Sequence, residues 1–190
     1  MKILHIFGPE EVPEEGEGLW AAKYDEETED ALTQFFKFSQ DPELMAKFCS
    51  ENIDDIRCKF GYDIDPETAA SELMDEADEL MHLIVRLAKR QPCSGSLQQA
   101  FKPLNNELNI TVLQTSKASS KTKARREPRL RIYAVRIDEH TYVVTGGAIK
   151  LTNSMQDRPH TEEQLRRVNM VRDWLKREGI SYPDDLNVLE

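Results

Sequence analysis

The chain has 190 residues and a formal net charge of −10, with 39% hydrophobic and 32% charged residues. This size and composition are typical of one water-soluble domain, and no apolar run is long enough to cross a bilayer. We therefore expect a single cytoplasmic domain over residues 1–190 with no membrane partner. The three cysteines and four histidines are scattered. This spacing predicts neither a disulfide framework nor a metal site, and we expect no cofactor.

The first half of the chain predicts two extended segments followed by helices. MKILHIF and LWAAKY have strand composition, and an acidic, Pro/Gly-rich loop separates them. A helix is expected over residues 25–40, with acids in its first turn. Asp41-Pro42 and Asp65-Pro66 each have the pattern of an N-cap followed by the first helical residue. The helix after Pro66 has the strongest apolar stripe, formed by Leu73, Ala77, Leu80, Ile84 and Leu87.

The second half changes to the alternation of strands. The pattern predicts a strand over Leu108–Leu113, a polar basic loop over residues 117–129, and a hairpin of LRIYAVRI with TYVVTGGAIKL. A last helix follows, for which Thr161 and Gln164 have the spacing of a capping box. The expected fold class is α+β, with N-terminal helices packed on a twisted antiparallel β-meander and a C-terminal helix. Residues 1–96 would form an acidic, mainly helical half, and residues 97–180 the sheet and the last helix.

The two halves differ in charge. Residues 1–100 carry a net charge of −14 and residues 101–190 carry +4. Eight basic residues and one acid, Glu127, lie between Lys117 and Arg136. This basic run is either a solvated, flexible loop or a surface that binds phosphate, and composition alone leaves both open.

The hairpin suggests how basic side chains converge. If a two-residue turn lies at Glu139-His140, Arg131 is opposite Ala148 and Tyr133 is opposite Gly146. Arg131, Tyr133 and Lys150 then project from one face, and the small residues leave an opening between them. The alternatives are that Arg131 extends over the sheet toward solvent, that Gly146-Gly147 marks a bulge, and that the Arg-Pro-His step is a simple turn.

Such a group of side chains suits a scissile phosphate. Arginine binds two phosphate oxygens, lysine supplies charge or a base, and tyrosine donates to an oxygen or stacks on a base. RNA cleavage through the 2′-hydroxyl needs these groups and no metal. The candidate catalytic residues are Arg131, Lys150, Tyr133 and His160. The candidate RNA-binding residues are Lys117, Lys121, Lys123, Arg125, Arg126, Arg129 and Arg158.

The same stretch resembles the RelE/HigB family of bacterial toxins from toxin–antitoxin pairs. That family has a KPL step, a strand of the YRVFY type, a strand entering HGFxKKT, and a proline before a terminal helix. The corresponding segments here are FKPLNN, LRIYAVRID, TYVVTGGAIKLT and the Arg158-Pro159 step, within about residues 97–176.

The resemblance implies a small α+β toxin fold and an endoribonuclease that cuts mRNA, usually on the ribosome. It also implies a cognate antitoxin protein that covers the basic surface. Arg131 would take the place of the family's transition-state arginine, and Lys150 that of a basic residue after the last strand. Two other hypotheses stay open: a non-catalytic module that binds nucleic acid or protein, and a domain whose acidic helices mask its own basic face.

Overall fold

The computed structural model describes residues 1–8, 18–60, 63–90, 95–104, 113–120, 128–152 and 154–189. The acidic loop expected after the first strand lies mainly outside these residues. The strands are β1 (Lys2–Phe7), β2 (Leu19–Lys23), β3 (Phe101–Pro103), β4 (Gln114–Ala118), β5 (Leu130–Arg136) and β6 (Tyr142–Ile149). The α-helices are α1 (Ala31–Gln40), α2 (Pro42–Glu51), α3 (Ile53–Phe60), α4 (Pro66–Ala88) and α5 (Pro159–Arg177). Short 3₁₀ turns form η1 (Leu97–Gln99), η2 (Met155–Asp157) and η3 (Pro183–Leu189).

The six strands form one mixed sheet in the order β1-β2-β6-β5-β4-β3. Four neighbouring pairs are antiparallel, but β2 runs parallel to β6. The expected α+β fold with an antiparallel meander is therefore wrong, and the fold is mixed α/β. The sheet differs from the prediction because β2 joins it as an inner strand. Its residues Leu19, Trp20, Ala21 and Ala22 are all buried. A strand that is apolar on both faces takes an inner position, here between β1 and β6.

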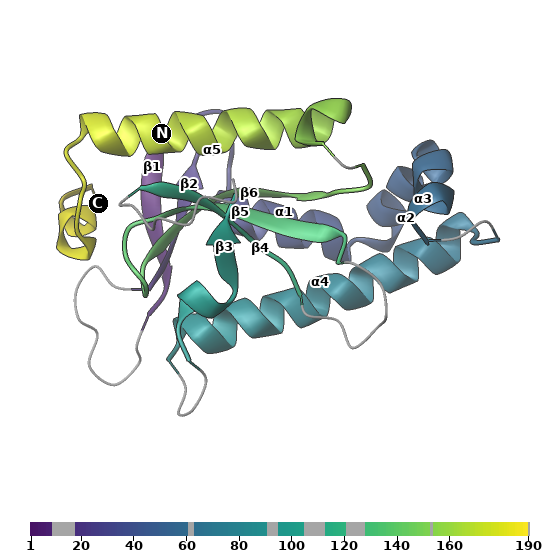
Figure 1. Ribbon diagram of the computed structural model, residues 1–190, viewed down its shortest axis with the longest axis horizontal. Helices are drawn as coiled ribbons and strands as arrows, with labels where there is room; N and C mark the ends of the chain where they lie inside the picture. The colour runs from purple at the N-terminus through teal and green to yellow at the C-terminus, as the bar shows by residue number, and fades with distance from the viewer. Residues whose placement is uncertain are drawn as a thin grey trace.

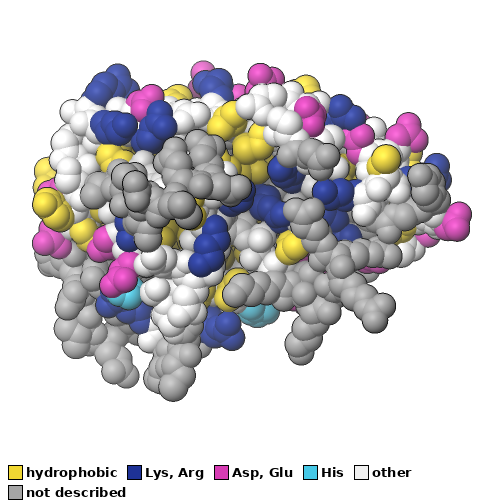
Figure 2. All heavy atoms as spheres, in the orientation of Figure 1, with side chains coloured by type: hydrophobic (Ala, Val, Ile, Leu, Met, Phe, Trp, Pro, Cys, Tyr) yellow, Lys and Arg dark blue, Asp and Glu magenta, His cyan; other side chains and the backbone are white. Residues whose placement is uncertain are grey.

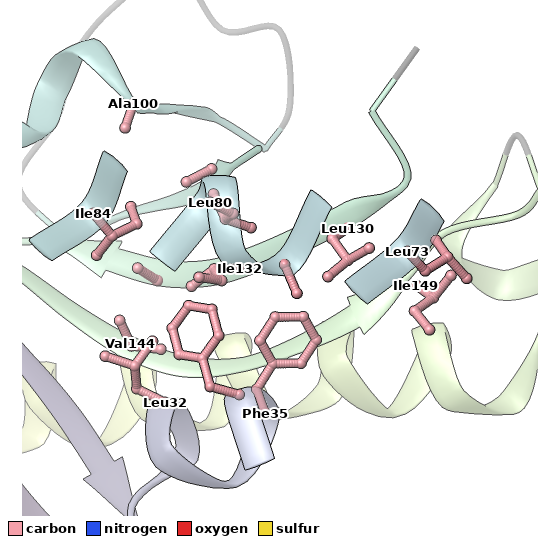
Figure 3. Close-up of a cluster of buried hydrophobic side chains, with 14 of the residues drawn as sticks. Leu32, Phe35, Leu73, Leu80, Ile84, Ala100, Leu130, Ile132, Val144 and Ile149 are labelled. Atoms are coloured by element: carbon pink, nitrogen blue, oxygen red, sulfur yellow. The ribbon is translucent and has the colours of Figure 1, made fainter. Parts of the chain in front are cut away.

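Helices cover both faces of the sheet (Figure 1). On one face α1 and α4 pack on alternate residues of β5 and β6, including Ile132 and Val144, and α2 packs on α1 and α4. Figure 3 shows this core, with Leu32 and Phe35 of α1 and Leu80 of α4 directed at the strands. On the other face α5 packs against Tyr133, Val135 and Ala148 through a second core. Among the described residues, none of the helices combines the length and apolar content that crossing a bilayer requires.

The helix starts follow local side-chain chemistry. Asp41 and Asp65 accept hydrogen bonds from backbone N–H groups at the starts of α2 and α4, and a proline follows each of them, as the sequence predicts. The start of α1 was predicted too early, because Asp30 is its N-cap and the preceding acids lie outside the helix.

The capping box predicted at Thr161 and Gln164 is also wrong. Thr161 lies inside α5, where its hydroxyl donates to the carbonyls of Met155 and Arg158. Ser154 and Asp157 form a capping box one turn earlier, at η2. The extra turn arises because the polar segment before Pro159 has its own capping residues.

A strand, β4, extends into the segment that the sequence predicts as a basic loop. Residues 105–112, which hold most of the predicted strand, are outside the described part of the chain. β4 begins at Gln114 and includes Lys117 and Ala118, which the sequence analysis assigned to a loop. Ser116 and Ala118 are buried while Lys117 is partly exposed, so the segment has the alternation of a strand although its residues are polar.

The β5–β6 register agrees with the prediction for an unexpected reason. Arg131 pairs with Ala148 and Tyr133 with Gly146, as expected. At the hairpin end, however, Arg136 pairs with Tyr142, so the loop is one residue longer than the predicted turn. A bulge beside Tyr133 then shifts the register by one residue and restores the predicted pairs. The alternative that the glycines mark a bulge is therefore also correct.

Candidate nucleic-acid interface

Three neighbouring strands place a row of candidate site residues on the face that α5 covers. Lys117 of β4 pairs with Tyr133 of β5, and Tyr133 pairs with Gly146 of β6. Arg131 lies one step along the same face, opposite Ala148. Lys150 follows β6, where its backbone N–H donates to the Arg129 carbonyl at 2.8 Å. Figure 2 shows Lys and Arg side chains gathered just below α5 in this view.

Tyr133 is enclosed beneath α5. Its side chain is 1% exposed, and its hydroxyl has no hydrogen-bond partner among the described residues. Burial raises the pKa of Tyr133 to about 12, and the charge of Arg131 opposes this rise only in part. The phenol is therefore protonated at neutral pH, so it is suited to donate a hydrogen bond and not to act as a base.

Gly146 provides space for a side chain of α5. A Cβ at position 146 would collide with the side-chain oxygen of Gln164, and the φ of Gly146 is +152°. The Gln164 oxygen is itself buried without a partner among the described residues. The opening that the sequence predicts beside Tyr133 is thus occupied by Gln164, for which the sequence pattern predicts only a capping role.

Arg131 lies at the margin of this enclosed region. It is 9% exposed, and its Nη1 donates to the Leu130 carbonyl at 3.0 Å. Its effect on the pKa of Tyr133 shows that the guanidinium lies within electrostatic range of the phenol. Lys117 has a less enclosed position, where its Nζ donates to the Leu104 carbonyl at 3.3 Å.

Arg129 belongs to a buried ion pair. Glu76 of α4 is 3% exposed and accepts hydrogen bonds from the backbone N–H groups of Arg129 and Leu130, at 2.6 and 2.7 Å. Its other oxygen accepts from Arg129 Nε at 3.2 Å, and Glu72 lies 3.5 Å from Arg129 Nη1. Arg129 is 7% exposed, and its ion pair with Glu76 connects the start of β5 to α4.

Arg158 and His160 face the helical layer. Arg158 makes two hydrogen bonds to Asp55 of α3, at 2.6 and 2.7 Å. His160 Nε2 lies 2.9 Å from the Ile149 carbonyl, and its ring packs edge-on against Phe48 of α2. The two residues bring α5 into contact with α2 and α3, and no described contact joins either of them to Arg131 or Tyr133.

Four of the candidate RNA-binding residues lie outside the described part of the chain: Lys121, Lys123, Arg125 and Arg126. Sequence reasoning missed Glu76 and Asp55 as partners of the basic residues, and Gln164 as the residue that lies against Gly146. Glu76 had a signal, because it lies three residues after Leu73 on the apolar stripe of α4, where a carboxylate needs a partner. Asp55 lies among many exposed acids and had no such signal.

Within the described ranges, no group of three or more His, Cys, Asp or Glu side chains is arranged to hold a metal ion. Comparison with family models, curated proteins and solved structures finds no match to this chain. The resemblance to the RelE/HigB toxins therefore stays a prediction that rests on the quoted motifs.

Proposed function

We propose that the protein is a cytoplasmic, metal-independent endoribonuclease that cuts mRNA, on the ribosome or free, in the manner of the RelE/HigB toxins. The observation that carries the proposal is the strand register, because Arg131, Tyr133 and Lys117 lie on one sheet face with Lys150 at its end. A second protein, the antitoxin, would cover this basic surface in the cell.

In the proposed reaction the 2′-hydroxyl of RNA attacks the adjacent phosphorus and the bond to the 5′-oxygen breaks. Lys150 takes the 2′-hydroxyl proton, Arg131 stabilises the charge on the non-bridging oxygens, and the departing 5′-oxygen receives a proton from Tyr133. Tyr133 is the donor, which is supported by the burial that keeps its phenol protonated. His160 contributes to the packing of α5 on α2 and is given no part in the chemistry.

The enclosure of Tyr133 and Gln164 favours a second candidate, a non-catalytic module that binds nucleic acid or an acidic protein. A phenol that is 1% exposed reaches RNA only if the first turns of α5 move. In the second candidate the basic side chains beside α5 bind a polyanion at the surface, while Tyr133 and Gln164 support the sheet from within.

Induced expression separates the two candidates. For the nuclease, wild-type protein arrests growth and cuts ribosome-bound mRNA in the presence of EDTA, whereas Arg131→Ala and Lys150→Ala lower cleavage by about 100-fold or more. Arg131→Lys keeps the charge without the two-pronged geometry, and we expect it to remain impaired. Arg57→Ala on α3, an exposed arginine without a partner among the described residues, is the matched control.

Because Arg131 is largely buried, each variant's unfolding midpoint is measured beside its activity. RNA binding that weakens steeply with salt, together with no cleavage by the wild-type protein, would establish the binding module instead. Loss of activity in Arg57→Ala equal to that in Arg131→Ala would remove the case for a specific site.

A further inference from the structure

A second polar site lies on the opposite face of the sheet from Arg131 and Tyr133. A hollow of about 390 Å³ opens between the C-terminal half of α4 and the end of the sheet formed by β3 and β4, and we call it the α4 hollow. Its volume falls in the range of about 300–1,000 Å³ that is usual for small-molecule sites. The hollow is lined by Glu79, Leu83, Arg86, Leu87, Gln99, Ala100, Lys102, Ser119 and Ser120.

The cationic groups of the α4 hollow are available for a ligand. Arg86 makes no hydrogen bond or ion pair with any described residue, although it lines a concave surface. Lys102 donates one hydrogen bond to the Gln98 carbonyl at 3.1 Å, which leaves two of its three N–H donors. An arginine beside a lysine in a concave site is the pairing that binds phosphate, by two-pronged hydrogen bonds and by point charge.

Ser120 gives an independent indication of a ligand. The residue is 2% exposed, and its hydroxyl is buried without a hydrogen-bond partner among the described residues. Native proteins seldom leave such a group unpaired, because the loss of hydration costs about 1–3 kcal/mol. Ser120 lines the hollow beside Ser119, so a ligand there lies next to the residue that carries this hydroxyl.

The other residues that line the hollow indicate which chemical groups the ligand carries besides its phosphate. Leu83, Leu87 and Ala100 give the hollow an apolar part, which suits a flat ring. Glu79, which also has no partner among the described residues, can accept a hydrogen bond from a ligand hydroxyl or amine. Inorganic phosphate alone would leave both features unused.

We propose that the α4 hollow binds a phosphate-bearing small molecule of mononucleotide size, with its phosphate on Arg86, Lys102 and Ser120 and its ring on the leucines. This site is separate from the proposed nuclease face and does not depend on the proposed function.

The test is calorimetric titration of the full chain with adenosine monophosphate, inorganic phosphate and adenosine at constant ionic strength. The nucleotide is expected to bind in saturable fashion and more tightly than phosphate or adenosine. Arg86→Gln is expected to weaken nucleotide binding about tenfold or more, and Ser120→Ala about threefold to tenfold. Arg57→Gln, the same change at an exposed helix arginine outside the hollow, is expected to leave binding unchanged.

A stability measurement distinguishes a binding role of Ser120 from a structural one. Because the hydroxyl has no partner among the described residues, Ser120→Ala should leave the melting temperature of the ligand-free protein unchanged or raise it, while binding weakens. The proposal is overturned by the absence of saturable nucleotide binding, by adenosine binding as tightly as the nucleotide, or by an equal loss in Arg57→Gln.

Discussion

Glu76 is the residue on which the start of β5 depends. One oxygen of its carboxylate accepts hydrogen bonds from two consecutive backbone N–H groups, those of Arg129 and Leu130, and the other accepts from the Arg129 side chain. All these groups are buried. Arg131 follows directly on β5. The contacts of Glu76 therefore also help to position the candidate catalytic arginine.

Replacing Glu76 with glutamine should destabilise the protein by about 3 kcal/mol, because it removes the buried counter-charge of Arg129 and leaves only the more exposed Glu72 beside the guanidinium. The free energy of unfolding in urea measures this loss. Asp75→Asn makes the same change of charge at the adjacent, exposed position of α4 and should cost less than about 0.5 kcal/mol. Similar losses in the two variants would mean that the net charge of α4 matters and the buried pair does not.

Residue-level predictions from the sequence succeeded where the cause is local. Asp41 and Asp65 cap their helices because the capping oxygen and the receiving N–H are three residues apart or fewer. Arg131 and Tyr133 share a face because side chains alternate along a strand. Gln164 could not be recognised as the residue opposite Gly146, because that contact depends on how α5 crosses the sheet.

At the scale of elements, the two glycines of β6 allow a helix to approach from each side. Gly146 makes room for Gln164 of α5, and Gly147 makes room for the ring of Phe35 of α1. Phe35 is 5% exposed and therefore cannot move into solvent. The sequence suggested one function for the pair, an entry for a polyanion, whereas the contacts of both glycines are with helices.

Gly147→Ala should therefore cost about 1–3 kcal/mol, because the added methyl group meets the centre of the Phe35 ring. In a Phe35→Ala background the same substitution should cost less than half as much, since the colliding atoms are gone. A double-mutant cycle from urea unfolding gives this coupling energy. An equal cost in both backgrounds would show that the collision with the Phe35 ring is not what makes glycine necessary at position 147.

The sheet topology was the element-level property that the sequence analysis missed. The sequence predicts both strands of the first half, β1 and β2. However, no local pattern indicates which strand of the second half pairs with β2. The continuous burial of Leu19 to Ala22 is the pattern of an inner strand. In the sequence, the unbroken run of apolar residues over the same positions is the signal that indicates an inner strand. The α3 helix, which brings Asp55 to Arg158, was missed because its apolar periodicity is short.

At the scale of the whole molecule, the acidic and basic halves are joined by ion pairs. Glu27 pairs with Arg167, Asp55 with Arg158, and Glu76 with Arg129. Each pair joins an acid from residues 1–96 to an arginine from residues 97–180. Two of these arginines, Arg129 and Arg158, are candidate RNA-binding residues. The pairs thus support the hypothesis that the helical half masks part of the basic surface.

The Asp55–Arg158 pair is the accessible member of this set, because the Arg158 side chain is 42% exposed. If the proposed function holds, Asp55→Asn frees a guanidinium for phosphate and should raise the affinity for single-stranded RNA about threefold to tenfold. One additional phosphate contact should also steepen the slope of log affinity against log salt by about 0.7. Fluorescence anisotropy with labelled RNA over a range of salt concentrations gives both quantities.

Two variants separate release of Arg158 from a general loss of negative charge. Asp54→Asn removes one charge from the adjacent, exposed position of α3, and should raise affinity less, with no change in the salt slope. Adding Arg158→Gln to Asp55→Asn should return both affinity and slope to the wild-type values, since the released group is gone. If Asp54→Asn and Asp55→Asn behave alike, the acidic half acts only through its long-range field, and Arg158 is a structural arginine that joins α3 to the start of α5.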